Sequence, residues 1–292
     1  MAIINYTSLN NIKKLTISEI PTTPTQIDEQ LGNYNEMAHA LSPSPFDLIR
    51  LSMTQPLTSQ YCAAYSLTAS AATLGILPEN KEVEVKLSEY NPSKITLKRE
   101  DNFTTLALKL YKLTRFDTAE IQDLLQVSSV PKAVEKGGSM PQRVTKVAAS
   151  LGLDAELFVT KQACDNFATL AQKEIDELGS KVNPQDVLAF VFGKPGEYTL
   201  TESPTPIPQA NELNLVLVQT PVNTLHWVAL SSDSTYFDSL RDFQPDGKFG
   251  CVGSQWSARP YVDTGIWITL KNQDKVKGVS PKLNVTGLFT FD

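Results

Sequence analysis

Helical patterns and strand patterns occupy different parts of this sequence, and that separation constrains the fold more than any other feature. The stretch from Tyr61 to Leu74 is mostly small or apolar, contains no proline or glycine, and is followed directly by Gly75. Such a stretch predicts a buried helix that ends at the glycine. Helical spacing and start signals predict further helices over 104–113, 117–126, 143–151 and 162–178.

Strand patterns dominate after Pro184. Short apolar runs rich in β-branched and aromatic residues predict strands at 187–192, 213–218, 227–230, 235–238 and 265–270, with one earlier strand at 154–159. Helices in the middle of a chain and strands near its end are typical of an α+β fold with antiparallel pairing. We therefore expect a helical part packed on a C-terminal antiparallel sheet.

The composition narrows the class of protein. Hydrophobic residues make up 41% of the 292 residues, which is ample for a core. The net charge of −6 and the lack of a dense Lys/Arg cluster argue against nucleic acid as a partner. No apolar run is long enough to predict a membrane span. Residues 1–45, rich in Thr, Asn, Ser and Pro, predict a loosely packed extension before a single domain over 46–292.

The cysteines are typical of a protein from a reducing compartment. Cys62, Cys164 and Cys251 are odd in number, far apart and without a Cys-x-x-Cys pair, which indicates neither a disulfide framework nor a zinc site. Phosphate-loop and calcium-loop patterns are also missing, so we expect no cofactor and no metal. The N-terminus shows no secretory pattern. We therefore expect a cytoplasmic protein, or one exported without a cleaved signal peptide.

A thiol, a histidine and a carboxylate occur in settings that suit joint chemistry. Cys62 opens the alanine-rich helix, where free backbone N–H groups and the helix dipole favour a thiolate and can hold an oxyanion. His226 is one of only two histidines and lies in a predicted strand, while Asp238 ends the next strand. The residues between the strands predict a hairpin that brings His226 beside positions near 238. We expect a nucleophile, a base and an orienting acid, in that order.

The other two cysteines suit the nucleophilic role less well. Cys251 lies on a glycine-rich segment where no helix begins, and Cys164 precedes Asp165 in a polar helix, where the negative charge disfavours a thiolate. Each member of the expected triad, taken singly, also suits a structural position in a protein core. The catalytic interpretation therefore depends on the three residues occurring together.

Three segments carry a family resemblance: Tyr61-Cys-Ala-Ala-Tyr-Ser-Leu, the stretch 138–153, and Leu225-His-Trp-Val-Ala-Leu with Tyr236-Phe-Asp after it. They resemble papain-like cysteine peptidases, and most closely the bacterial peptidases similar to the bacteriocin-processing domains of ABC transporters. The resemblance implies a papain-like fold, a protein or peptide substrate, and a glutamine before the cysteine that helps to bind the oxyanion. Gln55, seven residues before Cys62, is the first candidate, and Gln60, two residues before it, is the second. Ala63 departs from the glycine that is usual in the family.

One triad serves several reactions because only the second nucleophile differs. We expect a cysteine peptidase, with a role as a bacterial effector or toxin. The alternatives are a transglutaminase, deamidase or acyltransferase, and a papain-like module that binds without catalysis. The His-Trp pair followed by Tyr-Phe-Asp-Ser also resembles ubiquitin-like-protein proteases, but there the cysteine follows the aspartate at a longer interval than Cys251 does.

Overall fold

The computed structural model describes residues 55–56, 59–77, 79–130, 137–240 and 254–272. The extension expected over 1–45 and the alternative nucleophile Cys251 lie outside these residues. The helices are α2 (Cys62–Thr73), α3 (Phe103–Thr114), α4 (Thr118–Leu125), α5 (Pro141–Ser150), α6 (Lys161–Leu178) and α7 (Pro184–Phe192). The strands are β1 (Lys81–Glu84), β2 (Lys94–Leu97), β3 (Leu153–Thr160), β4 (Thr199–Thr201), β5 (Glu212–Gln219), β6 (Leu225–Ser231), β7 (Thr235–Phe237), β8 (Ser254–Gln255) and β9 (Val262–Asn272).

The main sheet has the order β4-β3-β9-β5-β6-β7-β8, and β1 and β2 form a separate antiparallel pair. Every pair in the main sheet is antiparallel except β3 with β4, so the expected antiparallel sheet is in fact mixed. β9 follows the other strands in the chain but lies between β3 and β5. The α+β class expected from the sequence is confirmed.

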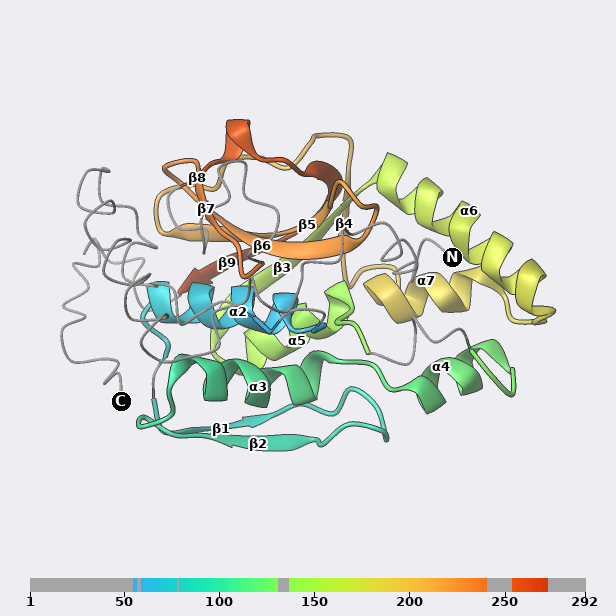
Figure 1. Ribbon diagram of the computed structural model, residues 1–292, viewed down its shortest axis with the longest axis horizontal. Helices are drawn as coiled ribbons and strands as arrows, with labels where there is room; N and C mark the ends of the chain where they lie inside the picture. Colours follow the sequence, from blue (N-terminus) through green and yellow to red (C-terminus); the bar gives the residue numbers. More distant parts are fainter. Residues whose placement is uncertain (1–54, 57–58, 78, 131–136, 241–253, 273–292) are drawn as a thin grey trace, which may run out of the picture.

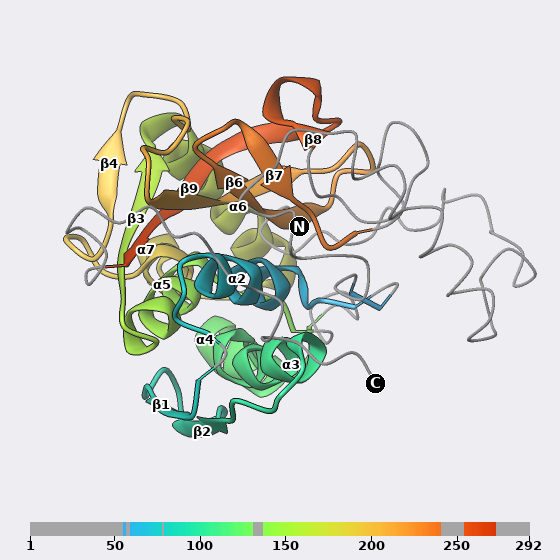
Figure 2. The ribbon, with the colours of Figure 1, turned by 90° about the vertical axis from the view of Figure 1, so that its left-hand side faces the viewer.

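The helix that begins at Cys62 lies at the centre of the layers. Figures 1 and 2 show α2 and α5 against the sheet, α3 on their other side, and the β1–β2 hairpin beyond α3. Every residue of α2 after Cys62 is buried, because small side chains let both layers approach it closely. Ser66 Oγ donates to Trp227 O at 3.0 Å, and Asn272 Nδ2 donates to Leu74 O at 2.7 Å, so β6 and β9 hold the helix near both ends.

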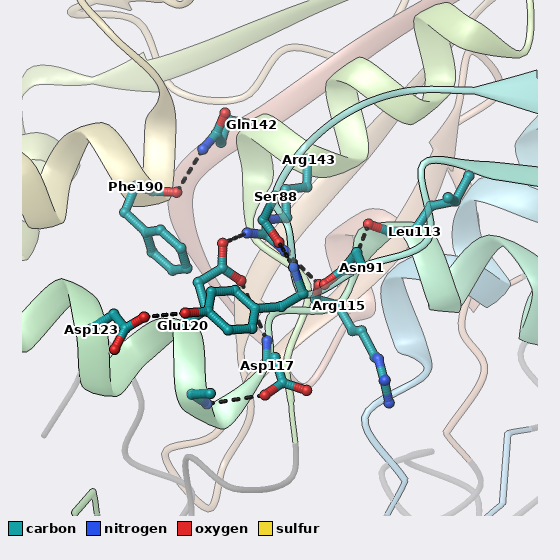
Figure 3. A network of polar contacts seen from close by, with 12 residues as sticks. Ser88, Asn91, Leu113, Arg115, Asp117, Glu120, Asp123, Gln142, Arg143 and Phe190 are labelled. Carbon is teal, nitrogen blue, oxygen red and sulfur yellow. Dashed lines mark hydrogen bonds and ion pairs between the residues drawn. The ribbon is translucent and has the colours of Figure 1, made fainter. Parts of the chain in front are cut away.

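A buried polar network fixes the corner where α3, α4 and α5 meet (Figure 3). Arg143 of α5 pairs with Glu120 of α4 and donates from Nη1 to Arg115 O at 2.6 Å. Asn91 Nδ2 donates to the same carbonyl at 2.6 Å and also to the last carbonyls of α3. Removal of either partner of such a buried ion pair would leave an uncompensated charge in the core, which is strongly destabilising. An isolated bridge between Arg115 and Ser139 ties this corner to the chain that enters α5.

The strand expected over 187–192 is wrong, because this run belongs to α7. Asn183 caps the helix by accepting from Gln185 N at 3.0 Å, and Pro184 occupies the first helical position. A short, continuous apolar run does not distinguish a buried helix from a buried strand. The capping box of Asp117 and Glu120 is confirmed at the start of α4. None of the helices in the described part of the chain has the length and apolar character of a membrane span.

Candidate active site

Cys62 is the first residue of α2 and is half-buried. The preceding Tyr61 is the N-cap and makes no side-chain capping hydrogen bond. The first N–H groups of an α-helix have no partner within the helix, so the start of α2 presents free donors beside the thiol. The Tyr61 ring packs edge-on against Tyr111 of α3, with 4.5 Å between the ring centroids, which holds the chain where it enters the helix.

His226 and Asp238 form a buried pair across the β6–β7 hairpin. Ala229 pairs with Phe237 in the register of the two strands, which puts Asp238 diagonally across from His226 on the same face. His226 Nε2 lies 2.7 Å from Asp238 Oδ1, and the two side chains are 2% and 0% exposed. The hairpin expected from the sequence therefore brings these two residues into contact.

Asp238 is held by more than the histidine. Leu240 N donates to Oδ1 at 2.8 Å, and Tyr261 OH donates to Oδ2. The Tyr261 ring also lies against the His226 ring, with 5.8 Å between centroids. Sequence reasoning missed Tyr261, because only the return of the chain into β9 brings it back to the hairpin. A tyrosine outside the predicted strands gave no signal of this contact.

The surroundings of His226 favour its charged form. Burial disfavours the imidazolium, but the charge and hydrogen bond of Asp238, and then the hydrogen bond and charge of Cys62, outweigh burial and raise the pKa of His226 from 6.5 to about 10. Because Nε2 is occupied by Asp238, Nδ1 is the ring nitrogen left for the thiol. The structure thus places His226 against Asp238 and within electrostatic reach of Cys62.

The two candidate glutamines lie in different places. Gln55 is buried beside the residue that follows Asp238: its backbone N donates to Ser239 O at 2.9 Å, and its Oε1 accepts from Ser239 Oγ at 2.8 Å. Its Nε2 donates to Ser59 O at 3.2 Å. Gln60 instead lines a pocket that includes Cys62.

A largely apolar pocket opens beside the thiol. It lies between the start of α2, the chain that enters α5, and the adjoining ends of β5 and β6. Its walls are Gln60, Cys62, Phe116, Gly138, Ser139, Met140, Pro141, Phe167, Val191, Leu217, Leu225 and Trp227. Phe116 N donates to Gly138 O at 2.9 Å, and Thr114 Oγ1 lies 2.9 Å from Ser139 Oγ, which ties the wall to the end of α3.

Cys164 lies away from this arrangement. It is half-buried in α6, where burial, and then the charge of Asp165, raises the pKa of its thiol. That environment disfavours a thiolate, as expected from the sequence. Within the described residues, no cluster of three or more histidine, cysteine or acidic side chains is arranged to hold a metal ion.

A cysteine-led helix packed on a sheet that carries a paired histidine and aspartate, in an α+β fold, defines a papain-like cysteine peptidase. Residues 54–273 match the family described as Invasion plasmid antigen J, cysteine protease, and the chain belongs to that family. The protein is therefore a cysteine peptidase whose substrate is a protein. No curated protein and no solved structure matches the chain. The closer resemblance to the bacteriocin-processing domains stays a prediction.

Proposed function

We propose that the protein hydrolyses peptide bonds with Cys62 as nucleophile, His226 as general base and acid, and Asp238 as the group that orients the imidazole. The supporting observation is the buried His226–Asp238 contact of 2.7 Å, with Cys62 close enough to the same ring to help raise its pKa. The raised pKa of His226 supports the proposal further, because an imidazolium beside the sulfur stabilises a thiolate as an ion pair.

The reaction proceeds in two halves. His226 takes the thiol proton, and the Cys62 sulfur attacks the carbonyl carbon of the scissile bond. The tetrahedral intermediate collapses as His226 gives that proton to the leaving amine, which leaves a thioester on Cys62. Water then attacks the thioester while His226 removes a proton from that water. Collapse of the second tetrahedral intermediate releases the carboxylic acid and restores the thiol.

The oxyanion needs donors beside the sulfur. The Cys62 N–H at the start of α2 supplies one donor. Gln55 is our choice for the second, because Ser239 fixes its carbonyl end and its primary amide carries two N–H groups, of which one goes to Ser59 O. Gln60, in the wall of the pocket, remains the second candidate.

The pocket beside Cys62 supports a preference for an apolar side chain near the scissile bond. Most of its walls are aliphatic or aromatic, and the transfer of apolar surface from water into such a site is favourable. We therefore propose polypeptide substrates that place a residue such as leucine in this pocket.

The triad is tested by measuring how Cys62→Ala reacts with iodoacetamide and whether it cleaves peptides. We expect loss of iodoacetamide labelling at pH 7 and loss of cleavage of a proteome-derived peptide library. Cys164→Ala is the matched control and should retain both, because burial raises the pKa of the Cys164 thiol. Labelling that persists unchanged in Cys62→Ala contradicts the assignment. Mass spectrometry of the products separates cleavage from the one-dalton or amine-sized shift of a deamidase or transglutaminase.

We further propose that the protein acts as a bacterial effector, exported without a cleaved signal peptide. Support comes from membership of a family named for an invasion plasmid antigen. The measurement is the fraction of epitope-tagged protein recovered in the medium of its own bacterium, at the full mass of the encoded chain. Retention in intact cells under every growth condition, including contact with host cells, contradicts export.

A further inference from the structure

A second hollow continues from the pocket beside Cys62. It is open to solvent, has a volume of about 530 Å³, and lies between the start of α6 and the start of β9. Phe167 and Leu225 belong to the walls of both hollows, so the two adjoin at these side chains. We call this second hollow the α6–β9 trough. Its walls are Thr160, Lys161, Gln162, Ala163, Asn166, Phe167, Leu170, Glu202, Pro204, Gln219, Leu225, Val262, Asp263, Thr264 and Gly265.

An irregularity in β9 shapes one side of the trough. The β5–β9 register shifts between Leu217 and Val218, and Thr264 Oγ1 donates to Leu217 O at 2.6 Å there. Gly265 has φ +77°, and a Cβ on it would lie 2.3 Å from Thr160 Oγ1. A glycine is therefore required at this position, and the bulge bends the strand locally. No side chain projects from position 265 into the trough.

The walls of the trough suit a polypeptide better than a small charged ligand. Gln162 and Asn166 are exposed and four residues apart on α6, so they share one face of the helix. Primary amides both donate to and accept from peptide groups. The charged walls carry both signs, from Lys161, Glu202 and Asp263, with one negative charge in excess. Val262 adds an apolar contact and is 64% exposed.

We propose that the α6–β9 trough binds the substrate polypeptide beyond the residue that fills the pocket beside Cys62, and that Val262 is one of its contacts. This inference rests on the proposed function, since it takes the polypeptide attacked by Cys62 as the occupant. The shared walls Phe167 and Leu225 carry the argument, because an extended chain that leaves the pocket across them enters the trough directly.

The test compares short and long covalent probes on the full chain. Epoxysuccinyl probes carry either one leucine or a leucine extended by five alanines, in two series that extend in opposite directions from the reactive group. The rate of Cys62 alkylation is followed by intact mass. The variants are Val262→Arg and, as a matched control, Leu200→Arg, since Leu200 is 57% exposed on β4 and lines neither hollow. Exposed substitutions of this kind disturb folding little.

We expect the long probe of one series to react faster than its short partner in the wild type and in Leu200→Arg. In Val262→Arg that advantage should fall roughly tenfold, while the short-probe rate is unchanged. The inference is overturned by equal rates for long and short probes in the wild type, by an advantage retained in Val262→Arg, or by a change shared by both probe lengths. Faster reaction of the long probe in Val262→Arg also overturns it, because another segment would then occupy the trough. Failure of every probe to alkylate Cys62 refutes the proposed function instead, and the inference falls with it.

Discussion

Replacing Asp238 with asparagine should remove the charged state of His226 while keeping the shape of the site. Burial is the largest influence on the His226 ring and disfavours its charge, and Asp238 supplies the first of the causes that overcome it. In Asp238→Asn burial prevails, and the pKa of His226 should fall below its ordinary value of 6.5. The imidazole is then neutral at pH 7, and the thiol loses its cationic partner.

The size of the effect follows from the wild-type pKa. A rise from 6.5 to about 10 corresponds to roughly 5 kcal/mol in favour of the imidazolium, at ~1.4 kcal/mol per pKa unit. Removing one partner of a buried ion pair costs about 3–5 kcal/mol. Because the folded-state pKa is raised, this stability is fully present below pH 6.5 and is lost as the pH rises through about 10. The difference in free energy of unfolding between the wild type and Asp238→Asn should therefore shrink as the pH rises from 6.5 to about 10.

The assays are urea unfolding at several pH values from 6 to 10 and the rate of Cys62 alkylation by iodoacetamide over the same range. Asp233→Asn is the matched control, because Asp233 lies in the turn of the same hairpin and accepts from Thr235 N at 3.0 Å, a bond that asparagine retains. We expect Asp238→Asn alone to lose stability at pH 7 and to react slowly. An alkylation profile of Asp238→Asn that coincides with the wild type across this range would refute the reasoning.

Two further substitutions test the supports of the triad. Tyr261→Phe removes the hydrogen bond to Asp238 Oδ2 and should lower the free energy of unfolding in urea by about 1.5–3 kcal/mol. It should also slow the alkylation of Cys62. The control Tyr111→Phe loses a neutral hydrogen bond to Gly137 O and should lower the free energy of unfolding by about 1 kcal/mol. Equal costs for the two would contradict a charge-assisted bond. Gln55→Ala should lower kcat for peptide cleavage by about 10²–10³-fold, as the loss of an oxyanion donor does, and a larger loss in Gln60→Ala would transfer that role to Gln60.

The parts of the site that could be predicted are those set by local sequence. Cys62 at a helix start and the pairing of His226 with Asp238 both follow from short-range signals: an alanine-rich run ended by Gly75, and two strand patterns separated by a turn. Local patterns of this kind fix helix starts and hairpin registers, because the contacts involved are close in sequence. The catalytic role of these residues stays a prediction that the proposed experiments address.

The parts that could not be predicted depend on contacts that are distant in sequence. Tyr261 reaches Asp238 only because β9 returns to the middle of the sheet, and Gln55 meets Ser239 across the whole catalytic region. The apolar run 187–192 fits both a buried strand and a buried helix, and only Asn183 and Pro184 before it carry a helix-start signal. Tertiary packing, rather than local preference, decides such cases.

The central position of β9 also sets the time at which the enzyme can become active during its synthesis. The ribosome releases Cys62 and His226 well before β9, yet β9 must insert between β3 and β5 to close the sheet. Strand pairing over such distances is slow, because the loop between the partners must close first. A nascent chain that stops short of residue 262 lacks β9, the strand that positions Tyr261 against Asp238. The cell that makes this protease is therefore exposed to its chemistry only after translation has passed β9.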